Sequence, residues 1–183
     1  TYRIDRKGPD AIVWFHDMAL LAGGRGADLE SRKGSLEAAF LVIITGAAEN
    51  DGYNALVLEA GLMWRDVALI RSISRFLRQI RVPYSQDYMW TTLVRHAPVA
   101  GEIVRLFHER FDPRANLATE DRAAREAAVV AEIETALAKV ESLDEDRILR
   151  HFVNAVRAAV RTNFYQIEAS GQAKPLIAIK YES

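Results

Sequence analysis

The most informative stretch of this sequence reads ENDGYN at residues 49–54, followed at once by ALVLEAGLMWRD at residues 55–66. Four hydrogen-bonding side chains stand around a single glycine, and an apolar run then returns the chain to a core. Asn and Asp side chains often bond to nearby backbone groups, so this density indicates a turn held in one geometry by its own side chains. A polar functional site is the alternative interpretation. The candidate structural residues are Glu49, Asn50, Asp51 and Asn54.

Helical periodicity continues on the C-terminal side of this stretch. Ser85 is a predicted N-cap. Ser142 and Glu145 are spaced as a capping box, in which each side chain bonds to the other residue's backbone amide. Leu149, Phe152 or Val153, Val156, Val160 and Phe164 form the predicted buried face of the helix after Ser142. Apolar residues at steps of three and four predict helices over 64–80, 98–111, 122–140 and 143–164, with a further helix after Ser85.

The N-terminal side shows a different pattern. Residues 2–15 predict two strands around a turn, because β-branched and aromatic residues flank Arg6-Lys7-Gly8-Pro9-Asp10. Residues 22–34, with Gly23, Gly24, Gly26 and several charges, predict a loop, and a helix is predicted from Ser35 towards Gly46. Residues 176–181 are strand-like again.

The predicted fold class is therefore mainly α, a bundle-like array of about six helices. The short N-terminal β-hairpin and the C-terminal strand are expected to belong to neighbouring domains that the sequence contains only in part. The expected organisation is a hairpin and loop over 1–30, a helical domain over 31–170 and the start of a following domain over 171–183.

Composition excludes several classes of function. The chain has 183 residues, 24 basic and 25 acidic, so a dedicated binder of nucleic acid or of an anionic membrane is disfavoured. The absence of cysteine excludes disulfides and thiolate metal sites and fits a cytoplasmic protein. No apolar run is long enough to span a membrane. His108-Glu109 lacks the second histidine of a zinc-protease motif, since position 112 is aspartate.

Two rows of arginine recur at helical spacing. One row is Arg71, Arg75 and Arg78. Each row is interpreted as a solvated helix face, with docking of acidic groups from a neighbouring domain or subunit as the alternative. The second row, predicted to lie along one helix, consists of Arg147, Arg150, Asn154, Arg157 and Arg161.

Three blocks of the sequence resemble the large bacterial NAD-specific glutamate dehydrogenases. The first is the opening stretch at 49–66, which is similar to the family's ENDG[FY]N and AGL.WR motifs. The second runs from RSISRFLRQIRVPYSQDY at 71–88 to LFHERFDP at 106–113, and the third contains SLDEDRILRHF, RTNFYQ and KPLIAIKYES between 142 and 183. Ala55 and Met89-Trp90 depart from the family pattern. Arg65 and Asn163 lie inside matching motifs and join the candidate structural or interaction residues.

The resemblance implies a parent enzyme that oxidises L-glutamate to 2-oxoglutarate and ammonium with NAD. It implies that the substrate lysines and the NAD-binding fold lie downstream, so that no residue here is catalytic, binds the cofactor or binds a metal. It places residues 31–170 between regulatory modules and the catalytic part, with other domains of the same polypeptide and a second subunit of a homo-oligomer as partners. The alternative is a stand-alone helical module that binds an acidic partner or an anionic effector.

Overall fold

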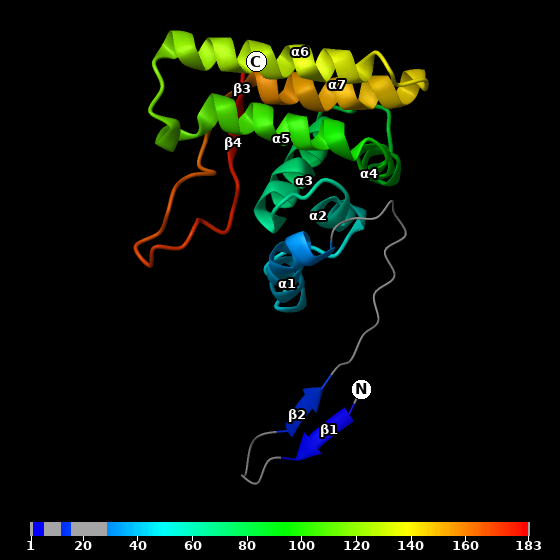
Figure 1. Ribbon diagram of the computed structural model, residues 1–183, viewed down its shortest axis with the longest axis vertical. Coiled ribbons are helices and arrows are strands. Elements are labelled where there is room, and N and C mark those ends of the chain that lie inside the picture. Colours follow the sequence, from blue (N-terminus) through cyan, green and yellow to red (C-terminus); the bar gives the residue numbers. More distant parts are fainter. Residues whose placement is uncertain (1, 6–11, 16–28, 183) are drawn as a thin grey trace.

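The computed structural model describes residues 2–5, 12–15 and 29–182, and this part is mainly helical, as predicted (Figure 1). Two antiparallel strand pairs accompany the helices: β1 (Tyr2–Asp5) with β2 (Ile12–Phe15), and β3 (Ala159–Thr162) with β4 (Ile179–Tyr181). The helices are α1 (Leu29–Ile44), the 3-10 turn η1 (Gly52–Ala55), α2 (Leu56–Glu59), α3 (Trp64–Gln79), α4 (Gln86–Arg95), α5 (Ala97–Phe111), the 3-10 turn η2 (Pro113–Ala115), α6 (Thr119–Leu137) and α7 (Leu143–Ala158).

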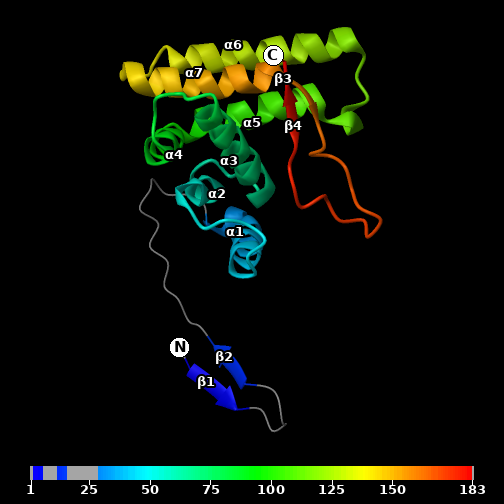
Figure 2. The same cartoon turned by 180° about the vertical axis from the view of Figure 1, so that it is seen from behind.

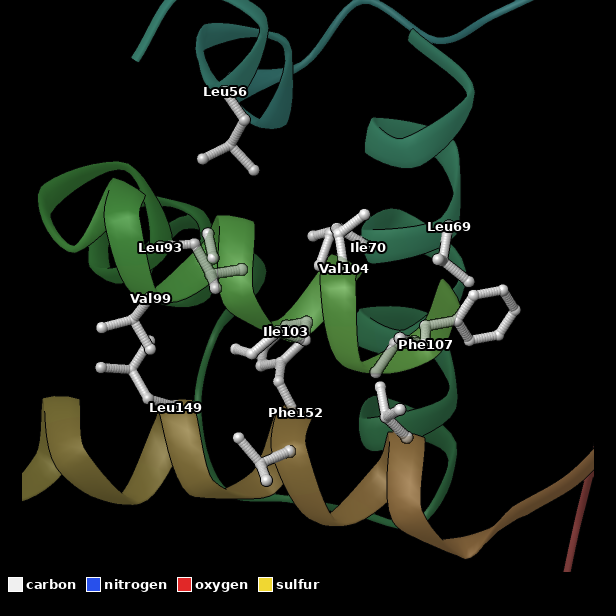
Figure 3. Packing of buried hydrophobic residues seen from close by; sticks show 14 of the residues in the cluster. Leu56, Leu69, Ile70, Leu93, Val99, Ile103, Val104, Phe107, Leu149 and Phe152 are labelled. Atoms are coloured by element: carbon white, nitrogen blue, oxygen red, sulfur yellow. The ribbon is translucent and has the colours of Figure 1, made fainter. Parts of the chain in front are cut away.

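Helix α5 lies at the centre of the helical body. Helices α6 and α7 run beside it in both views (Figures 1 and 2), and α3 packs against α5 and α7. Figure 3 shows Ile103 of α5 facing Phe152 of α7, and Phe107 of α5 beside Leu69 of α3; all four side chains have no solvent exposure. Burial of a large apolar side chain contributes about 1.5–3 kcal/mol, so these faces fix the positions of α3, α5 and α7.

The two predicted N-caps are present, but the predicted capping box forms only in half. Ser85 Oγ accepts from the Tyr88 amide at 3.1 Å, and Ser142 Oγ accepts from the Glu145 amide at 3.4 Å. The Glu145 carboxylate does not return to Ser142. It is 5% exposed, accepts a hydrogen bond from Arg95 and lies 2.8 Å from Nε2 of His96. A buried carboxylate needs such partners, and they outcompete a local backbone amide.

The loop predicted for residues 22–34 is wrong from residue 29 onward, because α1 begins at Leu29. Gly34 lies inside this helix. Its cost relative to alanine is about 1 kcal/mol, which does not end a helix of 16 residues that also contains Leu, Glu, Arg and Lys. The rest of that predicted loop lies outside the described residues, as does the turn predicted at 6–10.

The last helix is shorter than its apolar spacing predicted. Helix α7 ends at Ala158, and Val160 and Arg161 belong to β3, which pairs with β4. The β-branched residues here favour a strand once a partner strand is available. Val160 is 45% exposed, so its predicted burial is wrong, whereas Phe164 is buried as predicted.

The C-terminal strand packs against the helical body. Tyr181 of β4 stacks on Phe76 of α3, with ring centroids 3.7 Å apart and planes 8° apart. Among the described residues, no helix is long and apolar enough to cross a membrane.

Candidate functional site

The opening stretch forms a turn braced by hydrogen bonds. Asp51 caps η1, because its Oδ1 accepts from the Tyr53 amide at 3.1 Å, and the Asn54 side-chain amide donates to the Glu49 carbonyl at 3.0 Å. A Cβ atom on Gly52 would lie 2.5 Å from the indole nitrogen of Trp90, so a larger residue would force the Trp90 ring to move. The local bonds expected from the sequence are therefore present. Asn50 is exposed, beside the braced part of the turn.

Arg71 connects this turn to α3. Its Nε donates to Asp51 Oδ2 at 2.6 Å, and one terminal nitrogen donates to Asp51 Oδ1 at 2.8 Å and to Asn54 Oδ1 at 2.9 Å. Arg71 is only 5% exposed. The prediction of a solvated or docking row is therefore wrong for Arg71, since the guanidinium fork is buried against a carboxylate of its own chain. Arg75 and Arg78 are exposed, and Arg75 also pairs with Glu49.

The second arginine row does not form one stripe. Arg147 and Arg150 lie on α7, and Arg150 bonds to Asp146 on the same helix and to Glu134 of α6 at 2.8 Å. Arg157 is exposed near the end of α7. Arg161 lies on β3, so the prediction that a single helix presents the whole row is wrong. Within this row, Arg150 therefore connects α7 to α6, whereas Arg147, Arg157 and Arg161 are exposed.

Arg65 and Asn163 hold the segment between β3 and β4, which Figure 1 shows as the excursion in orange and red. Arg65, in the first turn of α3, donates to the carbonyls of Phe164 and Lys174, each at 2.9 Å. Its guanidinium carbon lies 4.8 Å from the centre of the Phe164 ring, and burial lowers the pKa of this guanidinium. The Asn163 side chain donates to the Leu176 carbonyl at 2.9 Å and accepts from the Ala178 amide at 2.7 Å. Together they fix both sides of the segment.

A chain of hydrogen bonds that the sequence did not reveal lies beside Arg65. Nε2 of His108 is 2.9 Å from Asp66 Oδ1, and Nδ1 of His108 bonds to the Tyr165 hydroxyl. Burial raises the pKa of Tyr165, so the phenol stays neutral at ordinary pH. The three residues come from α3, α5 and the segment after β3. The sequence alone shows His108 only as part of an incomplete zinc-protease motif. Residues 66, 108 and 165 are too far apart in the chain for any helical or strand spacing to connect them.

These residues line a cavity of about 580 Å³. Trp64, Pro113, Phe164 and Ile167 provide apolar surface. Arg114 stands beside the cavity, where it pairs with Asp112 at 2.7 Å and lowers the pKa of that carboxyl group. The volume and the mixture of aromatic walls with a few polar groups are typical of small-molecule sites.

The described residues contain neither a metal-binding group nor a dinucleotide fold. No cluster of three or more His, Cys, Asp or Glu side chains could hold a metal ion within that part of the chain. Both described sheets are antiparallel, whereas a dinucleotide-binding fold is built from parallel βαβ units. The described residues therefore do not form a dinucleotide-binding fold of this kind.

Comparison with known proteins identifies the family. The family described as glutamate dehydrogenase, helical motif 3, matches residues 48–113, and the catalytic domain of bacterial NAD-glutamate dehydrogenase matches residues 132–183. No solved structure matches the chain.

Curated relatives agree with these matches. The NAD-specific glutamate dehydrogenase of Pseudomonas aeruginosa is 41% identical over 92% of this chain, and that of Halomonas elongata is 37% identical over 94%. The Mycobacterium tuberculosis protein of the same name is 38% identical over 74% of this chain. The chain spans about a tenth of the length of the first two relatives and 8% of the third. The chain belongs to the large NAD-specific glutamate dehydrogenase family, as the motifs of its sequence predicted.

Proposed function

We propose that this chain is a non-catalytic helical segment of an NAD-specific glutamate dehydrogenase, and that it supports the beginning of the catalytic domain. The parent reaction in this proposal oxidises L-glutamate to 2-oxoglutarate and ammonium with reduction of NAD. NAD and the catalytic residues then lie elsewhere in the polypeptide, and the antiparallel pairing of both described sheets supports this part of the proposal.

The observation that carries the proposal is that side chains of α3 bond to and stack on residues of the catalytic-domain match. Arg65, in the helical-motif match, donates to carbonyls of Phe164 and Lys174, in the catalytic-domain match. Phe76, in the helical-motif match, also stacks on Tyr181, in the catalytic-domain match. The first part of the catalytic-domain match thus shares a core with the helical motif instead of forming a separate body, and a disturbance in one region reaches the other through these contacts.

The coupling of regulatory modules and contacts between subunits belong to the same proposal. The apolar surface of α1 is an argument for such contacts. Phe40, Leu41 and Ile44 are 43%, 61% and 65% exposed. Because an apolar helix face is normally covered by other protein, we expect another module or subunit to cover it. If the intact enzyme with Leu41→Glu keeps both its assembly size and its regulation, α1 has no such contact.

Arg65→Met in the intact enzyme tests the support of the catalytic domain. Methionine keeps much of the side-chain volume but cannot donate to the two carbonyls, so we expect lower glutamate-dependent NAD reduction together with a lower melting temperature. Arg78→Met is the matched control, because Arg78 is exposed on the same helix. Equal activity in the two variants would contradict the support role.

The isolated chain provides the second arm of this test. We expect no NAD reduction with glutamate and no binding of NAD by the purified 183-residue chain. Reduction of NAD that a single substitution within the chain abolishes would show that the segment is itself catalytic.

A further inference from the structure

Asp66, His108 and Tyr165 form the polar side of the cavity beside Arg65. In the His108 tautomer that carries its proton on Nε2, the Tyr165 hydroxyl donates to Nδ1 and Nε2–H donates to Asp66 Oδ1. This tautomer is assigned because the other one would place the lone pair of Nε2 against the Asp66 carboxylate. The Tyr165 proton is then committed, and its oxygen offers only lone pairs. The second oxygen of the Asp66 carboxylate is also an acceptor. A molecule that bonds to this side must therefore bring hydrogen-bond donors.

The charged groups around the cavity disfavour a charged ligand. Arg65 already donates to two carbonyls and lies over the Phe164 ring. Arg114 is held by Asp112, and its guanidinium carbon lies 5.6 Å from the centre of the Tyr165 ring. A cationic ligand would meet two guanidinium groups at the aromatic faces it would otherwise use. An anionic ligand would meet the carboxylates of Asp66 and Asp112, which line the same cavity.

The walls favour a planar ring. Trp64 contributes aromatic surface, and Pro113 and Ile167 contribute aliphatic surface to the same cavity, whereas the Phe164 ring is covered by Arg65. Aromatic side chains bind planar rings by stacked or edge-to-face contact. The cavity of about 580 Å³ lies within the range of about 300–1,000 Å³ that holds small organic ligands.

We propose that this cavity binds a neutral planar heteroaromatic ring that carries at least one N–H donor, the chemistry of a nucleobase, with Tyr165 and Asp66 as the acceptors. The site stands apart from the catalytic and cofactor roles assigned to the parent enzyme and does not depend on them. It lies where α3, α5 and the segment after β3 meet, so an occupant would contact both regions matched by the family comparison.

The test uses a pair of probes that differ in the donor alone. Benzimidazole is a planar ring with one N–H, and 1-methylbenzimidazole has the same ring without that donor. Both are titrated into the full chain at mildly alkaline pH, where they are neutral, and the amide resonances of residues 164–167 are followed by NMR. We expect benzimidazole to shift these resonances and to bind about 3- to 10-fold more tightly than its methylated form. Absence of binding, or equal affinity of the two probes, overturns the proposal.

Two variants locate the site. Tyr165→Phe removes the acceptor oxygen and is expected to reduce the preference for the N–H probe towards 1, whereas Tyr84→Phe removes a hydroxyl bonded to Asp144, away from the cavity lining, and should preserve the preference. Ile167→Trp fills the cavity from a position that is 66% exposed, so it should block binding without disturbing the core. If Tyr165→Phe fails to fold, the affinity of Ile167→Trp for benzimidazole decides the test. An affinity equal to that of the unmodified chain overturns the proposal.

Discussion

At the residue scale, the Glu49–Asn54 turn shows how one buried arginine gives a local motif a fixed place in the fold. The bonds from Asp51 to the Tyr53 amide and from Asn54 to the Glu49 carbonyl are local and could form in a short peptide. The bidentate pair with Arg71 is not local, since 20 residues separate Arg71 from Asp51. A polar turn that would otherwise face water is thereby held against α3.

Replacement of Arg71 by methionine is expected to destabilise the chain strongly. The substitution leaves the Asp51 carboxylate, 20% exposed, without its guanidinium partner, and loss of one member of a largely buried ion pair costs about 3–5 kcal/mol. Urea denaturation measures the change. Arg75→Met is the control, because Arg75 is 59% exposed and pairs with an exposed Glu49, an arrangement worth about 0–1 kcal/mol. Similar losses in the two variants would show that burial of Arg71 contributes nothing.

At the scale of elements, the helices and strand β4 follow local signals, whereas strand β3 does not. The N-caps at Ser85 and Ser142 and the start of α5 near Pro98 are confirmed, because caps and helix periodicity act over a few residues. Strand β3 was missed, because its apolar residues continue the spacing of α7. Pairing with β4, which begins 17 residues after β3 ends, decides its conformation, and the sequence contains no local trace of that pairing.

Asn163→Ala is expected to loosen the segment between β3 and β4. The change removes the bonds to the Leu176 carbonyl and the Ala178 amide, and loss of such bonds costs about 1–2 kcal/mol. Hydrogen exchange should become faster at the amides of residues 176–181 while the exchange in α5 stays unchanged. Asn154→Ala on the exposed face of α7 is the matched control. Unchanged exchange in the Asn163 variant would mean that Arg65 alone holds the segment.

At the scale of the whole molecule, a single core joins the helical motif to the start of the catalytic-domain match. Helix α5 packs against α3, α6 and α7, and Arg110 on α5 donates to the carbonyl of Arg157 in α7 and to that of Ala159, the first residue of β3. A boundary between two independently folding units inside this part of the chain is therefore not supported by the packing. The domain boundaries expected from the sequence at 30 and 170 stay predictions.

Alkaline pH is expected to destabilise this shared core through its buried tyrosines. Burial raises the pKa of Tyr181 and of Tyr53 from 10.0 to about 12. A raised pKa means that the folded state favours the neutral phenol, so the stabilisation is complete below pH 10 and is lost as the pH rises towards about 12. The midpoint of urea unfolding should therefore fall over this interval.

Tyr181→Phe tests the origin of that fall. The Tyr181 hydroxyl is buried and has no hydrogen-bond partner among the described residues, so the variant should be at least as stable as the unmodified chain at neutral pH. Between pH 10 and 12 it should lose less stability, because phenylalanine cannot ionise. An equal loss in both proteins would assign the alkaline effect to other groups.

The sequence by itself determined the family, the mainly helical class, most helix ends and the internal bonds of the Glu49–Asn54 turn. These properties depend on motifs and on interactions across a few residues. Only the tertiary structure decided that Arg71 is buried and that β3 replaces the end of a helix. It also brought Asp66, His108 and Tyr165 together across separations of 42 and 57 residues at one cavity. Such contacts depend on how the helices pack, and no local spacing in the chain records that packing.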